Sequence, residues 1–174
     1  MATSLEKTAN IATIVVVFAA CVALSWQFYT NAEIRARRAS AGQPTFKVGD
    51  AMATVPGIDY AEAQRTLLLM VSNTCKYCTE SMPFYKKLTA LRREGIWRFI
   101  AVATENVETT TEYLAASGIR ADQVVSVPLG TVGARGTPTI VVVDKTGHVL
   151  ALWAGLLIGE KEEAVVRAVL GRTD

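Results

Sequence analysis

Histidine and cysteine, the usual ligands of structural zinc, are scarce in this chain of 174 residues, which contains one histidine and three cysteines. A structural zinc site normally needs four cysteine or histidine ligands. The histidine, His148, falls at the start of an expected strand, and Cys21 lies in a long apolar run, where a small apolar role is expected. Cys75 and Cys78 are the one close pair, so the sequence disfavours both zinc and a framework of structural disulfides.

A strong charge imbalance is also absent. The formal net charge is +2, and no stripe of lysine and arginine interleaved with aromatic residues is present. Nucleic-acid-binding domains usually carry such a basic footprint. We therefore expect no nucleic-acid partner.

Charged residues are missing from residues 8–32, and residues 11–29 are almost wholly apolar. At a rise of about 1.5 Å per residue, a helix over this run spans about 28 Å, enough to cross the hydrocarbon core of a bilayer. Trp26 and Tyr29 mark one end, where aromatic side chains favour the headgroup region, and three arginines follow. The run predicts a single-pass transmembrane helix.

A cleaved signal peptide is the alternative explanation of this run. Residues 39–41 read Ala-Ser-Ala, a cleavage-site pattern, but they lie about ten residues beyond the apolar run. An uncleaved anchor fits better. We expect an N-terminal tail and anchor in residues 1–36, a linker in residues 37–47 and one folded domain in residues 48–174.

The folded part alternates strand-like and helix-like segments, which predicts the α/β class with a mixed sheet. Parallel units come first and an antiparallel hairpin follows. Pro83 should kink the helix that contains it, because proline lacks the N–H and clashes with the preceding turn. The expected strands are residues 66–72, 97–103, 124–127, 139–144 and 148–154, and the expected helices are residues 60–65, 76–94, 107–117 and 160–170.

The motif Cys75-Lys76-Tyr77-Cys78 stands where the first strand gives way to a helix. The first sulfur should therefore lie at a helix N-terminus, where unpaired N–H groups and the helix dipole favour an anion. The thiolate is the nucleophile of disulfide exchange. The placement predicts a redox pair, with Cys75 as the exposed nucleophile and Cys78 as the buried resolving thiol. A copper(I) metallochaperone, whose soft ion suits thiolates, and a redox-silent interaction module are the alternatives.

The chain resembles the membrane-anchored, thioredoxin-fold TlpA/ResA-like thiol–disulfide oxidoreductases. The resemblance rests on the expected anchor, on Cys75-x-x-Cys78 followed by Ser-Met-Pro, and on Gly-Thr-Pro-Thr before the strand at residues 139–144. It implies a thioredoxin-like fold, a central mixed sheet flanked by helices, with no cofactor. It also implies a cis Thr137–Pro138 bond that faces the cysteines and leaves the Thr137 backbone free to pair with protein thiol or disulfide substrates.

Three positions depart from this family. Thr74 replaces the usual tryptophan before the first cysteine, and Ser81 replaces the usual glutamate before Met-Pro. Leu69 stands where thioredoxin has a buried aspartate. Lys76 and Glu80 are the nearby charged residues, and we treat both as candidate modulators of the cysteine pKa values.

Taken together, the sequence predicts a membrane-anchored oxidoreductase that exchanges disulfides with protein partners. The excess of Lys and Arg after the apolar run would place the domain in the cytoplasm. The resemblance implies the opposite, extracytoplasmic or periplasmic side, and we follow the resemblance.

Overall fold

The computed structural model describes residues 16–27, 45–92 and 94–172. Residues 1–40 and 41–174 form two compact units. In the first unit, residues 16–27 are helical. Within the described ranges, no helix has both the length and the apolar character needed to cross a membrane. The ends of the predicted anchor and most of the predicted linker lie outside the described residues.

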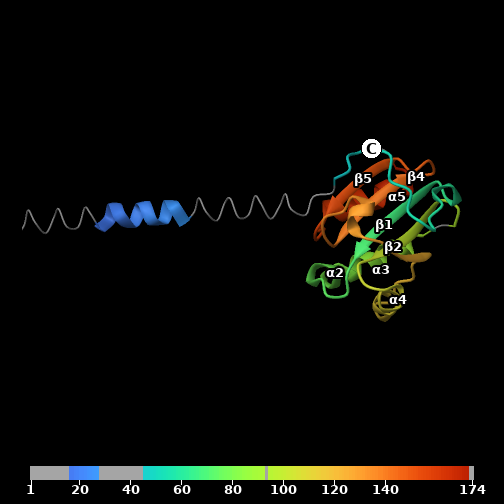
Figure 1. Ribbon diagram of the computed structural model, residues 1–174, viewed down its shortest axis with the longest axis horizontal. Coiled ribbons are helices and arrows are strands. Elements are labelled where there is room, and N and C mark those ends of the chain that lie inside the picture. The colour runs from blue at the N-terminus through green and yellow to red at the C-terminus, as the bar shows by residue number, and fades with distance from the viewer. Residues whose placement is uncertain (1–15, 28–44, 93, 173–174) are drawn as a thin grey trace, which may run out of the picture. The chain divides into compact units, whose positions relative to one another are not determined.

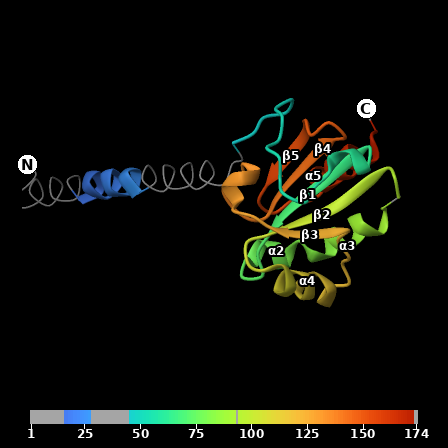
Figure 2. The same cartoon turned by 45° about the vertical axis from the view of Figure 1, so that its right-hand side comes forward.

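The second unit is built on a five-stranded mixed sheet with the order β3-β2-β1-β4-β5 (Figures 1 and 2). Strand β1 is parallel to β2, and β2 is parallel to β3. Strand β4 is antiparallel to β1 and β5, so the predicted mixed sheet is confirmed. The strands are β1 (Arg65–Val71), β2 (Trp97–Ala103), β3 (Gln123–Ser126), β4 (Thr139–Asp144) and β5 (Val149–Ala154).

Helices and short 3-10 turns connect the strands. The helices are α2 (Lys76–Glu80), α3 (Met82–Ala90), α4 (Val107–Ala116) and α5 (Glu160–Leu170), and the 3-10 turns are η1 (Tyr60–Glu62) and η2 (Leu129–Val132).

The helix predicted over residues 76–94 is instead two helices, and this expectation was wrong. The break falls at Ser81, and Pro83 lies in the first turn of α3. Proline is tolerated there because the first N–H groups of a helix have no partner within it, whereas inside one continuous helix it would remove a hydrogen bond. The second helix ends at Ala90, four residues before the predicted end at residue 94.

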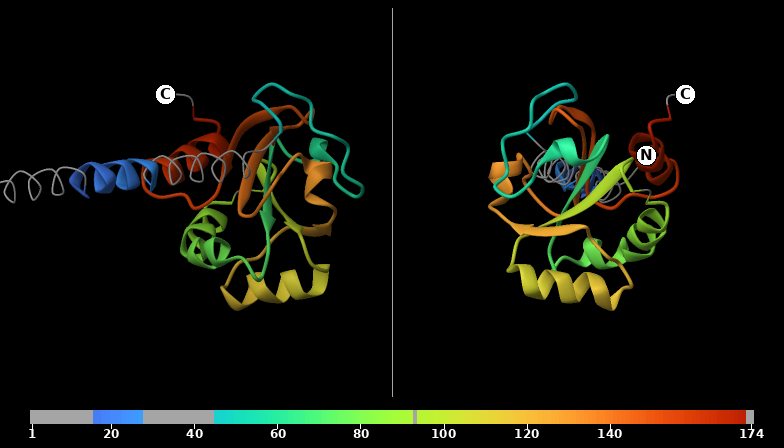
Figure 3. Two further views of the ribbon diagram at one scale, coloured as in Figure 1. Left: turned by 60° about the vertical axis from the view of Figure 1, so that its left-hand side comes forward. Right: turned by 90° about the vertical axis from the view of Figure 1, so that its right-hand side faces the viewer.

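Apolar side chains bury both faces of the sheet, which explains why its central strands are unbroken apolar runs. On one face, alternate residues of β1 such as Leu67 and Leu69 pack with side chains from all four helices of the second unit. On the other face, Leu68 and Met70 pack with the segment before β1 and with η2. Figure 3 shows α3 and α5 on one side of the sheet, with the segment of residues 45–59 and η2 on the other.

The sheet topology brings three loops to one edge. Because β1 and β2 are parallel and in register, the segments after Val71 and Ala103 leave the sheet side by side. Strand β4 runs the other way, so its start at Thr139 lies beside Met70 near the end of β1. The loop that carries the cysteines, the loop after β2 and the loop before β4 therefore meet.

Candidate active site

Cys75 is the N-cap residue of α2, as the sequence predicted. Its backbone is extended, with φ −84° and ψ 112°, and its side chain is partly exposed. The Cys78 N–H donates to Cys75 Sγ at 3.3 Å. The Cys75 thiol in turn donates to the Thr137 carbonyl oxygen at 3.3 Å. The sulfur thus lies between the helix start and the loop before β4.

The two sulfurs have opposite pKa shifts. Burial raises the pKa of Cys75, but hydrogen bonds with the side chains of Cys78 and Thr137 and with backbone N–H groups outweigh burial and lower it. Cys78 is fully buried, and burial together with the neighbouring Cys75 sulfur raises its pKa to about 12. Both are free thiols. The pair therefore has one ionisable, accessible sulfur and one protonated, covered sulfur.

The peptide bond between Thr137 and Pro138 is cis and faces Cys75, as the resemblance implied. The Pro138 carbonyl accepts the Gly155 N–H at 2.8 Å, which ties this loop to the end of β5. The Thr137 N–H makes no hydrogen bond to another residue in the described part of the chain. The loop thus holds the Thr137 carbonyl against Cys75 Sγ and leaves the Thr137 N–H available as a hydrogen-bond donor.

Lys76 and Glu80 lie on the outer surface of α2. Their side chains are 81% and 42% exposed and form an ion pair with Nζ and Oε1 3.6 Å apart. Neither is among the groups whose hydrogen bonds shift the pKa of Cys75. The structure does not bring them into the hydrogen bonds around the sulfurs, and their modulating roles stay predictions.

Sequence reasoning missed a set of polar contacts made by the loop and helix that carry the cysteines. The Ser72 hydroxyl, just after β1, donates to Glu105 Oε1 at 2.6 Å. Tyr113 on α4 shares a 2.9 Å hydrogen bond with Thr79 on α2. Glu105 lies two residues after a buried strand that pairs with β1, and that position is the signal that could have found it.

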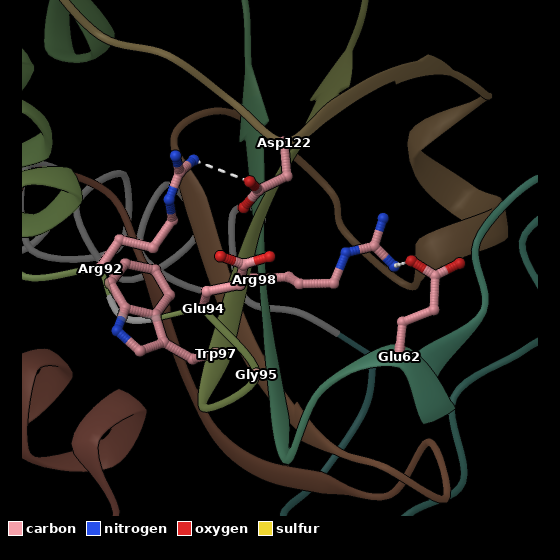
Figure 4. Close-up of a pocket in the computed structure, with 7 residues that line it drawn as sticks. All are labelled: Glu62, Arg92, Glu94, Gly95, Trp97, Arg98 and Asp122. Atoms are coloured by element: carbon pink, nitrogen blue, oxygen red, sulfur yellow. Dashed lines mark ion pairs between the residues drawn. The ribbon is translucent and has the colours of Figure 1, made fainter.

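A polar pocket of about 510 Å³ lies at the opposite edge of the sheet, where β2 begins. Figure 4 shows its two ion pairs, Arg92 with Asp122 and Arg98 with Glu62. Both guanidinium groups are already paired, so the described residues that line the pocket offer no uncompensated cation. It lies far along the strands from the cysteines and does not belong to their site.

Comparison with known proteins identifies the fold family. Residues 58–170 match the thioredoxin-like domain family. The chain belongs to this family. With its Cys75-x-x-Cys78 pair it is a thioredoxin-like thiol–disulfide oxidoreductase. Among curated proteins, none matches the chain.

Several solved structures share the fold. The thioredoxin domain of a thiol-disulfide oxidoreductase from Bacteroides vulgatus has a TM-score of 0.56 and 19% identity, and the match covers 71% of this chain and 97% of that one. A thiol:disulfide interchange protein from a Bacteroides species has a TM-score of 0.54 and 16% identity, with 75% and 90% covered. A thioredoxin family thiol:disulfide interchange protein from Chlorobium tepidum has a TM-score of 0.51 and 20% identity, with 74% and 98% covered.

Proposed function

We propose that the protein is a membrane-anchored oxidoreductase that exchanges disulfides with protein partners, with Cys75 as the attacking sulfur. The observation that carries the proposal is the asymmetry of the pair: Cys75 is accessible and has a lowered pKa, whereas Cys78 is buried and has a raised pKa. Solved structures with this fold are named as thiol:disulfide interchange proteins, which supports the same reaction.

The reaction begins when Cys75 loses its proton and its thiolate attacks one sulfur of a partner disulfide. The partner's sulfur–sulfur bond breaks, one partner thiolate leaves, and a mixed disulfide with Cys75 forms. Cys78 then loses its proton and attacks Cys75 Sγ, which lies beside it. The mixed disulfide breaks, the partner leaves with two thiols, and the Cys75–Cys78 disulfide remains. Two electrons pass to the partner, and the reverse sequence oxidises a partner dithiol.

Thr137 is the residue we propose for docking the partner backbone. Its N–H has no hydrogen-bond partner among the described residues, and its carbonyl contacts Cys75 Sγ. An extended segment that pairs with this N–H would place its own sulfur near Cys75. Backbone pairing of this kind gives affinity without requiring a particular amino-acid sequence in the partner.

Replacing Cys78 with serine tests the exchange chemistry. Cys75 could still attack, but no thiol would resolve the adduct, so mixed disulfides with partners should accumulate. They should appear as bands that vanish with reducing agent, and the Cys75→Ser/Cys78→Ser double variant should show none. Absence of such bands under every redox condition, or bands that resist reduction, would refute attack by Cys75.

The membrane anchor and the extracytoplasmic side are proposed from the apolar run at residues 11–29 and from the family resemblance. A membrane-impermeant maleimide applied to intact cells should label Cys75. Labelling that requires cell lysis would place the domain in the cytoplasm, as the arginines after the run indicate. Release of the protein from membranes by a salt or carbonate wash would refute the anchor.

A further inference from the structure

Glu105 forms a link from the loop after β2 to the loop that carries the cysteines. Thr104 extends the pairing of the two parallel strands by one step, because its N–H donates to the Val71 carbonyl at 3.2 Å. Glu105 follows directly, and its Oε1 accepts the Ser72 hydroxyl at 2.6 Å. Hydrogen bonds to an ionised acceptor are short and strong, which fits this distance.

Ser72 in turn contacts both cysteines through its backbone. It is 7% exposed, so its position is fixed by packing. Its carbonyl accepts the Cys75 N–H at 3.3 Å, and a hydrogen bond from its backbone lowers the pKa of Cys78. Its hydroxyl also lies 3.0 Å from Thr74 Oγ1. One residue therefore joins the carboxylate of Glu105 to the segment that holds both sulfurs.

The charge on Glu105 has no counter-ion in the described part of the chain. Burial raises its pKa, but the hydrogen bond from the Ser72 hydroxyl and other nearby hydrogen bonds outweigh burial, so the pKa lies below its usual value. Glu105 is consequently ionised at neutral pH. Glu105 is linked through Ser72 to the loop that carries both cysteines, and a carboxylate without a counter-ion disfavours a nearby thiolate, because like charges repel.

The other ionisable groups near the sulfurs are neutral or paired with one another. Tyr85 on α3 and Tyr113 on α4 both have a raised pKa, mainly because they are buried, and so stay neutral at neutral pH. Lys76 and Glu80 on α2 neutralise each other at the surface.

We propose that Glu105 is a positioning residue for the dithiol, and that, held by Ser72, its carboxylate controls how readily Cys75 becomes a thiolate. The inference rests on the proposed exchange function and adds a residue to its site. The positive helix start favours the Cys75 thiolate, and Glu105 opposes it. The balance between the helix start and the Glu105 charge determines the rate at which Cys75 attacks and the reduction potential of the cysteine pair.

The test compares Glu105→Gln with wild type and with Glu108→Gln, using the full-length chain in mild detergent. Glutamine keeps an acceptor for Ser72 and removes the charge. Glu108 is exposed in the first turn of α4 and loses the same charge without contacting Ser72. Thiolate absorbance and iodoacetamide rates are measured against pH, and the reduction potential is measured in glutathione buffers.

Glu105→Gln should lower the Cys75 pKa by about half a unit or more, so alkylation below that pKa should become about threefold faster. The pair should also become more oxidising, because the reduced state gains a more stable thiolate. Glu105→Asp keeps the charge, so its Cys75 pKa and its reduction potential should lie closer to those of wild type. A Glu105→Gln pKa and potential equal to those of Glu108→Gln would overturn the proposal.

The role of Ser72 is tested by the Ser72→Ala variant and the double variant. If Ser72 holds the carboxylate, Glu105→Gln should have a smaller effect on the Cys75 pKa in the Ser72→Ala background. An equal effect in both backgrounds would overturn action through Ser72. If Glu105→Gln fails to fold, Ser72→Ala alone must still shift the Cys75 pKa, and no shift would overturn the proposal. A wild-type chain without a titrating dithiol would refute the exchange function instead.

Discussion

Alkylation of the reduced protein should strongly favour Cys75 over Cys78. Cys75 has a pKa below the ordinary thiol value of 9.0, whereas that of Cys78 is about 12. The gap exceeds three units, so at pH 7 the Cys75 thiolate should be at least about 1,000-fold more abundant than the Cys78 thiolate. Cys78 is also fully buried, which slows its reaction further.

Trypsin makes this comparison direct, because Lys76 separates the two sulfurs. Cleavage after Arg65, Lys76 and Lys86 yields one peptide that ends just after Cys75 and a second that contains Cys78. Brief treatment with iodoacetamide at pH 6–7, followed by quenching, digestion and mass spectrometry, gives both rates in one experiment.

The unfolded chain provides the control. In denaturant the helix start and the burial are lost, so the two cysteines should be labelled at similar rates. Equal labelling in the folded protein, or faster labelling of Cys78, would refute the assignment of attacking and resolving sulfurs.

Three further predictions concern stability and independence of the domain. Deleting residues 1–40 should leave a folded, redox-active domain, since this segment is a separate compact unit; loss of the circular dichroism signal would contradict this. Gly133→Ala should destabilise the protein by about 1–3 kcal/mol more than Gly49→Ala in urea unfolding, because both glycines have positive φ but an added Cβ at Gly133 overlaps the Phe46 ring. Asn106→Ala should cost about 1 kcal/mol, because its side chain caps α4; an unchanged unfolding midpoint would show that the cap is dispensable.

Much of the fold was predictable because its signals are local. The apolar run at β2 and the run at β4 gave strand bounds identical to those observed, and the predicted ends of α5 were also confirmed. The division at Ser81 was missed because proline was expected to bend one helix rather than to begin another. The cost of proline depends on its position within a turn, and position is decided by packing as well as by sequence.

Only those residues of the site that lie in short sequence motifs could be predicted. The Cys-x-x-Cys spacing placed one sulfur at a helix start, and Gly-Thr-Pro-Thr indicated the facing loop through the family resemblance. Ser72 and Glu105 carry no such motif. Ser72 and Glu105 are 33 residues apart along the chain, and their contact depends on the register of the two parallel strands that precede them. The position of Glu105 just after a buried strand was the available signal, and it does not identify Ser72 as the partner.

Formation of the mixed disulfide should itself activate Cys78. Burial raises the pKa of Cys78 first, and two further causes both come from Cys75: the hydrogen bond between the two side chains and the charge on the Cys75 sulfur. Once Cys75 is bonded to a partner, its sulfur carries no charge and is a poorer hydrogen-bond acceptor. The pKa of Cys78 should then fall below about 12, which favours its thiolate at the step that needs it. Cys75→Ala reproduces the loss of charge, so absorbance titration of this variant should give a Cys78 pKa below the upper step of the wild-type dithiol. An unchanged or higher value would mean that burial alone sets the pKa of Cys78 and that the resolving step is activated in some other way.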